Sequence, residues 1–213
     1  MTTINLRRAI NREEFDYSWL VSRLSHYSNP RVKINAMLKK GDIIRVKKGI
    51  YIFGEQYRLR PYSRELLANW IYGPSIVSLD YMLSYYGLIP EQVYAMTSTT
   101  PKRSRNFNTP VGAFIYRQVP LKYNRIGMTR IEWSTGSFLA ASPERALADK
   151  IRDDQFNILR SLADAKRYLF EDLRIDEEIF MNMDAGLLKE LAIAAQSKKI
   201  RICADLLLKY QTK

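Results

Sequence analysis

The stretch that most constrains this chain runs from Pro30 to Phe53 and reads PRVKINAMLKKGDIIRVKKGIYIF. Asn29 can cap a helix whose first turn holds Pro30, because proline lacks an amide that would be unpaired there anyway. Gly41 can adopt the left-handed conformation that closes this helix. Two short apolar segments then follow, joined at a Lys-Lys-Gly turn. The stretch therefore predicts a helix followed directly by a basic β-hairpin.

The outer face of this predicted helix has the chemistry of a DNA-binding surface. Lysine and arginine attract phosphates, Asn35 can pair with adenine through two hydrogen bonds, and small apolar groups can lie against a thymine methyl. A solvated helix can also carry many lysines, but the hairpin tip adds two more beside it, which favours DNA. We therefore predict a winged helix-turn-helix domain over residues 1–56. Its expected DNA contacts are Arg31, Lys33, Asn35, Ala36, Lys39, Lys40, Arg45, Lys47 and Lys48.

The net charge supports a polyanionic partner. The 213 residues carry a formal charge of +12 and a sequence pI near 9.7. Residues 1–60 hold 13 Lys and Arg against 5 Asp and Glu, so most of the excess lies in the predicted DNA-binding domain. Nucleic acid is the first expected partner and an anionic membrane surface the second.

The cysteine count and the hydropathy pattern indicate in which cellular compartment the protein is expected. Cys203 is the only cysteine, which excludes an intramolecular disulfide and fits a reducing compartment. No apolar run approaches the length of a membrane span, and the N-terminal segment has no apolar signal region. We therefore expect a cytoplasmic protein that does not act at a membrane.

The remaining sequence predicts an α+β fold. Residues 5–27 are expected to be helical with a break near Phe15, and segment 55–63 (EQYRLRPYS) is the predicted domain boundary. In the second domain, residues 62–213, a helix is expected to end at Gly73, and Ser78 is expected to cap the next helix. Four segments with β-forming residues predict a small antiparallel sheet: VYAMTST, GAFIYRQV, TRIEWS and SFLAA. A helix starting at Ser142-Pro143 and further amphipathic helices complete the prediction.

A second run of positive charge lies inside the predicted sheet. Residues 92–131 contain seven lysines and arginines and no acidic residue. Such a run is often only a solvated surface, but a second patch that faces phosphates or a partner is an equally good interpretation. Its members are Lys102, Arg103, Arg105, Arg117, Lys122, Arg125 and Arg130.

The sequence offers little catalytic chemistry. It contains no glycine-rich phosphate loop, no nucleophile elbow and no HExxH zinc motif. His26 is the only histidine, and Glu144 and Asp149 are the nearest candidates for a nuclease-type metal site. These two acids lie five residues apart, about 140° around a helix, and do not share a face. We expect no catalytic set, no metal and no cofactor.

Several sequence blocks together resemble the AbiEi family of antitoxin and transcriptional-regulator proteins. The most specific are YGPSIVSLDYMLSYYGLIPE at 72–91 and ASPERALADK at 141–150, within a resemblance that covers residues 15–150. The family more often has lysine at the position of Arg145. The last 60 or so residues contain no motif that matches.

The resemblance implies an N-terminal winged helix-turn-helix that binds inverted repeats in the promoter of its own operon and represses transcription. It also implies a mixed α/β antitoxin domain with a helical C-terminal region. In the type IV toxin–antitoxin scheme this domain counters a nucleotidyltransferase-like toxin as a functional antagonist, without requiring a stable complex. The resemblance assigns no catalytic residues to this chain.

Two other functions remain open from the sequence. The chain can be a metal-dependent nuclease or another nucleic-acid-processing enzyme that uses a winged helix only for targeting. It can also be a protein-interaction module whose basicity is incidental. Steep salt dependence of DNA binding favours the regulator over the interaction module.

Overall fold

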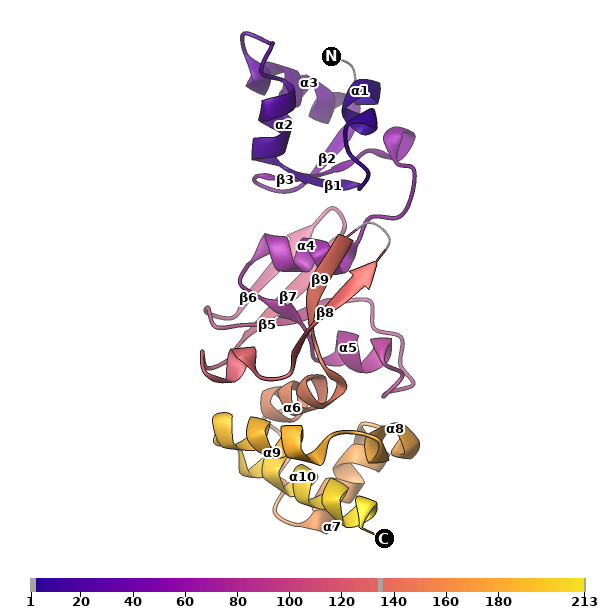
Figure 1. Cartoon of the computed structure of the whole chain (residues 1–213), viewed down its shortest axis with the longest axis vertical. Coiled ribbons are helices and arrows are strands. Elements are labelled where there is room, and N and C mark those ends of the chain that lie inside the picture. Colours follow the sequence, from indigo (N-terminus) through magenta and orange to yellow (C-terminus); the bar gives the residue numbers. More distant parts are fainter. Residues whose placement is uncertain (1–2, 134–135, 213) are drawn as a thin grey trace.

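The structure is a computed structural model that describes residues 3–133 and 136–212. The fold is α+β, and its parts follow one another along the long axis of the molecule (Figure 1). An N-terminal unit lies at one end, a β-sheet with its helices lies in the middle, and C-terminal helices lie at the other end.

The N-terminal unit interleaves helices and short strands. Its elements are α1 (Thr3–Arg8), β1 (Glu14–Asp16), α2 (Tyr17–Arg23), α3 (Pro30–Lys40), β2 (Ile43–Lys47) and β3 (Ile50–Phe53). The strands form an antiparallel sheet in the order β1-β3-β2. The sequence predicted helix on both sides of a break near Phe15, but this segment is a strand because it completes the sheet along β3. Asp16 then caps α2 by accepting from the amide of Trp19 at 2.7 Å.

The core of this unit is formed by apolar residues of α2, α3 and the sheet. Leu20 and Leu24 are fully buried, and Ile34 and Met37 of α3 are almost so. Phe15 of β1 packs against Phe53 of β3 with ring centroids 4.8 Å apart. One apolar face of α3 is thereby fixed to the core, which leaves the opposite face free.

Gly54 allows the end of β3 to approach the end of α3. Its amide donates to the carbonyl of Asp42 at 2.8 Å, and a Cβ at this position would overlap the carbonyl oxygen of Gly41. Gly41 itself has a positive φ of 74° and closes α3, so it cannot easily move away. The two backbones therefore require glycine at position 54.

We expect Gly54→Ala to lower the free energy of unfolding by about 3 kcal/mol, because the backbones must separate to admit a methyl group. Urea denaturation followed by circular dichroism measures the effect. Gly186→Ala is the matched control, since Gly186 lies in the first turn of a helix and a Cβ there would lie 3.0 Å from one side-chain oxygen of Asp184, with no backbone atom in its way. A change at Gly54 no larger than at Gly186 would contradict the argument.

The central sheet is larger than predicted, and it is mixed. Its strands are β4 (Ile76–Val77), β5 (Met96–Thr100), β6 (Arg105–Thr109), β7 (Gly112–Gln118), β8 (Met128–Trp133) and β9 (Gly136–Ala141), in the order β6-β7-β5-β4-β9-β8. The pairs β4–β9 and β5–β7 are parallel, so the predicted antiparallel sheet is wrong. Parallel pairing joins segments distant in sequence, and local alternation cannot reveal it.

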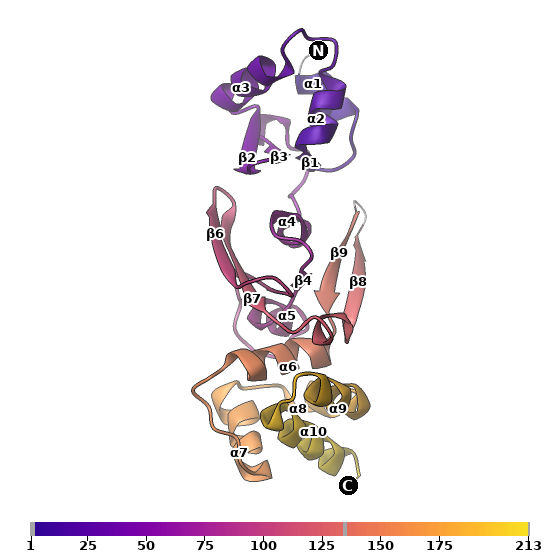
Figure 2. The ribbon, with the colours of Figure 1, turned by 90° about the vertical axis from the view of Figure 1, so that its left-hand side faces the viewer.

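Two helices pack on this sheet. Helix α4 (Arg64–Ile71) lies between the β6–β7 hairpin and the β8–β9 hairpin (Figure 2). Helix α5 (Asp80–Tyr85) follows β4. Ser78 does not cap α5, because Leu79 occupies that position and the Ser78 hydroxyl donates elsewhere.

Helix α6 (Pro143–Asp153) joins the sheet to the C-terminal helices, and its cap is the predicted Ser142. The helices beyond it are α7 (Leu162–Arg167), α8 (Glu177–Met181), α9 (Ala185–Ala194) and α10 (Lys198–Gln211). A π-helical segment, Tyr168–Asp172, continues α7. In the described part of the chain, no helix combines the length and apolarity that crossing a lipid bilayer requires.

Candidate nucleic-acid interface

Helix α3 forms as its sequence predicts. The Asn29 side chain accepts from the amide of Val32 at 3.4 Å, Pro30 occupies the first turn, and Gly41 has the left-handed conformation. No acidic residue lies in the first turn, and Lys39 and Lys40 end the helix. Cations at a helix C-terminus interact favourably with the helix dipole, so these lysines are compatible with a stable helix.

The outer face of α3 is exposed and predominantly cationic. Val32 has 63% of its surface exposed, although it is a large apolar residue. The other exposed residues of this helix include Arg31, Asn35, Ala36, Lys39 and Lys40, all predicted contacts. Lys33 is half-buried, and its ammonium lies 5.5 Å from the centre of the Tyr27 ring. The helix therefore presents an amide and several cations together.

A groove of about 630 Å³ separates α3 from the β2–β3 hairpin. Arg31 and Asn35 line it from the helix, and Arg45 and Lys48 line it from the hairpin. The guanidinium Nε of Arg31 donates to the Tyr17 hydroxyl at 3.2 Å, and this hydrogen bond raises the pKa of Arg31. The groove thus gathers donor groups from two elements on one surface.

Lys47 is the exception among the predicted contacts, because it turns toward the central sheet. Pairing of β2 with β3 shifts register between Arg45 and Lys47, which marks a β-bulge at Val46. A bulge breaks the alternation of side chains, so Lys47 does not share the direction of Arg45. Its ammonium donates to the carbonyl of Ile71 and lies 4.4 Å from the centre of the Phe107 ring. Lys47 therefore does not lie beside Lys48 on the α3 surface, where the sequence predicted it.

The second basic run does not form a single patch. Arg117 is paired with Asp153 at 3.1 Å, and Arg130 is paired with Glu132 at 2.8 Å on β8, the opposite edge of the sheet from β6. Lys122 and Arg125 are exposed on the connection between β7 and β8. Lys102, Arg103 and Arg105 remain together at the start of β6. Alternation of strands separates residues that lie close in the sequence.

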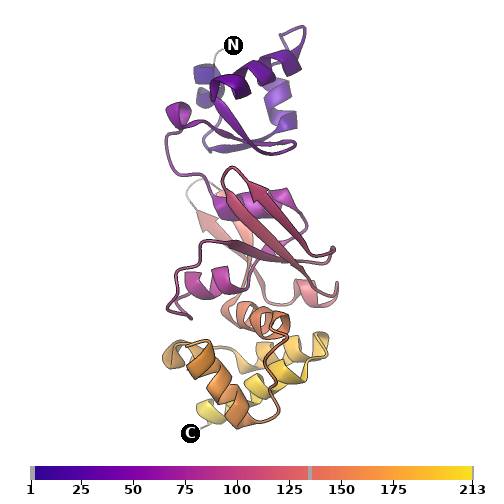
Figure 3. The ribbon, with the colours of Figure 1, turned by 180° about the vertical axis from the view of Figure 1, so that it is seen from behind.

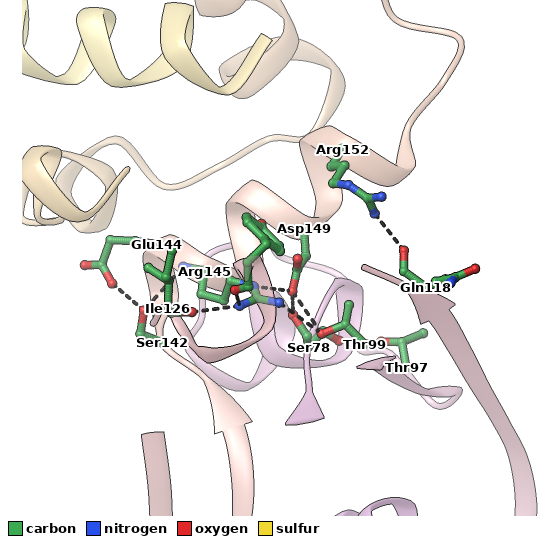
Figure 4. A network of polar contacts seen from close by, with 11 residues as sticks. Ser78, Thr97, Thr99, Gln118, Ile126, Ser142, Glu144, Arg145, Asp149 and Arg152 are labelled. Carbon is green, nitrogen blue, oxygen red and sulfur yellow. Dashed lines mark hydrogen bonds and ion pairs between the residues drawn. The ribbon is translucent and has the colours of Figure 1, made fainter. Parts of the chain in front are cut away.

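A buried polar network that the sequence did not predict joins α6 to the sheet (Figure 4). The Arg145 and Asp149 side chains are fully buried, and Arg145 Nε donates to Asp149 Oδ2 at 2.9 Å. The Ser78 hydroxyl donates to the same oxygen at 2.6 Å, and Thr99 lies at 3.3 Å from it. Arg145 and Asp149 of the ASPERALADK segment thus hold α6 to the sheet.

The remaining donors of Arg145 are used as well. Its Nη1 donates to the carbonyls of Tyr123 and Ile126, both at 2.7 Å, and its guanidinium lies 3.9 Å from the centre of the Tyr123 ring. Burial, and after it the charge of Asp149, raises the pKa of Tyr123. An i, i+4 Arg–Asp pair in an amphipathic helix signals a surface ion pair, so sequence pattern alone could not reveal this network.

The candidate metal ligands do not meet. Glu144 accepts from the Ser142 hydroxyl at 2.8 Å and from the amide of Asp184 at 3.1 Å, away from the contacts of Asp149. Lys150 pairs with Asp80 at 2.6 Å. Within residues 3–133 and 136–212, no His, Cys, Asp and Glu side chains gather in a group that could hold a metal ion. The geometry gives no support to Glu144 and Asp149 as a joint metal site.

The chain matches no known family model and no curated protein sequence.

Proposed function

We propose that this chain is a DNA-binding transcriptional autorepressor whose N-terminal unit is a winged helix-turn-helix. The element order α1-β1-α2-α3-β2-β3, with the antiparallel strand order β1-β3-β2, supports this assignment. In it the second helix of the helix-turn-helix enters the major groove, which assigns recognition to α3. The β2–β3 hairpin is then the wing.

One observation carries the proposal: α3 and the wing present Arg31, Asn35, Arg45 and Lys48 around a common groove, with Lys39 and Lys40 exposed beside it. Cations supply the sequence-independent attraction to phosphates. Asn35 supplies an amide for adenine, and the exposed Val32 and Ala36 supply apolar contacts for thymine.

The direct experiment is an electrophoretic mobility shift of the full chain with DNA from upstream of its own gene, at several salt concentrations. We expect preferential binding to inverted repeats in this DNA and a steep linear fall of log affinity with log salt. Binding that does not change with salt would refute the proposal and favour a protein-interaction module.

Asn35→Ala is expected to relax discrimination at a single base pair of the operator by about 1–3 kcal/mol, because the amide is assigned to one adenine. Competition with operators changed at each position measures this loss. Lys48→Gln is the comparison, since loss of a phosphate contact should weaken all sequences alike. Unchanged sequence preference in Asn35→Ala would contradict the assigned orientation of α3.

For residues 62–213 we propose the antitoxin role that the sequence resemblance implies. The partner is a nucleotidyltransferase-like toxin, and antagonism does not require a stable complex. The test is to look for a nucleotidyltransferase-like gene beside this one and to measure growth of cells that express its product, with and without the full chain. Failure of the full chain to restore growth would refute this role without affecting the DNA-binding proposal.

A further inference from the structure

Three cations converge where the wing meets the central sheet, and we propose that they form a binding site for a phosphoryl group. Lys47 comes from the end of β2, Lys102 precedes β6, and Arg105 begins β6. The β2–β3 hairpin lies directly against the β6–β7 hairpin in the views of Figures 2 and 3. We call Lys47, Lys102 and Arg105 the junction cluster.

An aromatic platform supports the junction cluster. The rings of Tyr72 and Phe107 lie with centroids 5.5 Å apart. Lys47 lies 4.4 Å and Arg105 5.1 Å from the Phe107 centroid, and Lys102 lies 5.3 Å from that of Tyr72. Ring faces attract cations, so the platform explains how like charges can be held close together.

No carboxylate neutralises the junction cluster within the described residues. Arg117 and Arg145 of the same domain, by contrast, are each paired with an aspartate. Partial burial, and after it the charges of Arg105 and Lys102, lowers the pKa of Lys47. Binding of an anion would therefore reduce the repulsion between the positive charges of the cluster.

The cluster also keeps donors available for an anion. Lys47 donates to the carbonyl of Ile71 and Lys102 to that of Gly73, at the end of α4. An ammonium has three donors, so each lysine retains two. The Arg105 guanidinium makes no hydrogen bond within the described residues, and Arg105 and Lys102 are exposed. Several unused donors around an open, uncompensated positive site suit the oxygens of a phosphoryl group.

The ligand can be a free phosphate compound or the backbone of a nucleic acid, because both present the same anionic oxygens. The inference does not depend on the reading of DNA by α3. Because Lys47 belongs to the wing and Arg105 to the central sheet, a ligand bound here would contact both elements at once.

The test is an NMR titration of the isotopically labelled full chain with inorganic tripolyphosphate at low salt. We expect saturable shifts of the backbone amides of Lys47, Tyr72 and Phe107. The variant Lys102→Gln/Arg105→Gln should bind at least tenfold more weakly. The matched control is Lys122→Gln/Arg125→Gln, which removes the same charge from exposed residues outside the cluster and should change affinity less than twofold. No shifts in the wild type, or an equal loss in both variants, would overturn the proposal.

A second arm uses a short duplex of unrelated sequence with the same variants and with Asn35→Ala. Weaker duplex binding in the junction variant supports a nucleic-acid backbone as the ligand, while loss of tripolyphosphate binding alone supports a free phosphate compound. Asn35→Ala should leave tripolyphosphate binding unchanged in either case. The experiment therefore tests the phosphate site independently of DNA recognition by α3.

Discussion

Replacing Asp149 with alanine is expected to lower the free energy of unfolding by about 3–5 kcal/mol. The change leaves the guanidinium of Arg145 inside the protein, with neither solvent nor a counter-charge, since both side chains are fully buried. The Ser78 hydroxyl also loses its acceptor. Removing one partner of a buried ion pair is costly because the remaining charge still pays its full desolvation penalty.

Urea denaturation followed by circular dichroism measures this effect, and Asp153→Ala is the matched control. Asp153 lies one helical turn further along α6, and its ion pair with Arg117 has 38% and 39% of the two side chains exposed. An exposed pair contributes at most about 1 kcal/mol. If Asp149→Ala costs no more than Asp153→Ala, the buried pair does not hold α6 to the sheet.

The buried network also gives a physical reason for arginine at position 145. A planar guanidinium can donate to Asp149, Tyr123 and Ile126 at once, whereas an ammonium has no fixed fork with which to do so. Resemblance between sequences identified this helix as distinctive, but did not say why. The structure gives a packing role to Arg145 and Asp149 of this helix.

Local signals in the sequence predicted local structure well. Asn29, Pro30 and Gly41 delimit α3, and Ser142 begins α6, because capping depends only on residues within one turn. These features needed no knowledge of the rest of the chain.

Predictions that depended on distant partners failed. The helix break near Phe15 was predicted, but not the strand that forms there by pairing with β3, far along the chain. The Ser78 hydroxyl donates a hydrogen bond to Asp149, 71 residues away, instead of capping a helix. At the candidate interface, Arg45 and Lys48 line the groove beside α3, but a bulge turns Lys47 toward the sheet. No pattern within the hairpin marks that bulge.

The strongest expected effect on DNA binding comes from removing charge at α3 and the wing together. In Lys39→Gln/Lys40→Gln/Lys48→Gln, three exposed lysines that make no hydrogen bond or ion pair within the described residues lose their charge. Stability should therefore change little. If each lysine contacts one phosphate, the slope of log affinity against log salt should fall by about three.

That change in slope corresponds to a roughly 500-fold loss of affinity at 0.1 M salt, if the two proteins bind equally at 1 M. Fluorescence anisotropy with labelled operator DNA over a series of salt concentrations measures both quantities. The control is Lys189→Gln/Lys198→Gln/Lys209→Gln, which removes three exposed charges from α9 and α10 at the other end of the molecule (Figure 1). Each variant lowers the formal net charge from +12 by three, so net charge alone predicts equal effects on DNA affinity. Only a specific interface at α3 and the wing predicts that the slope falls in the first variant and is preserved in the second.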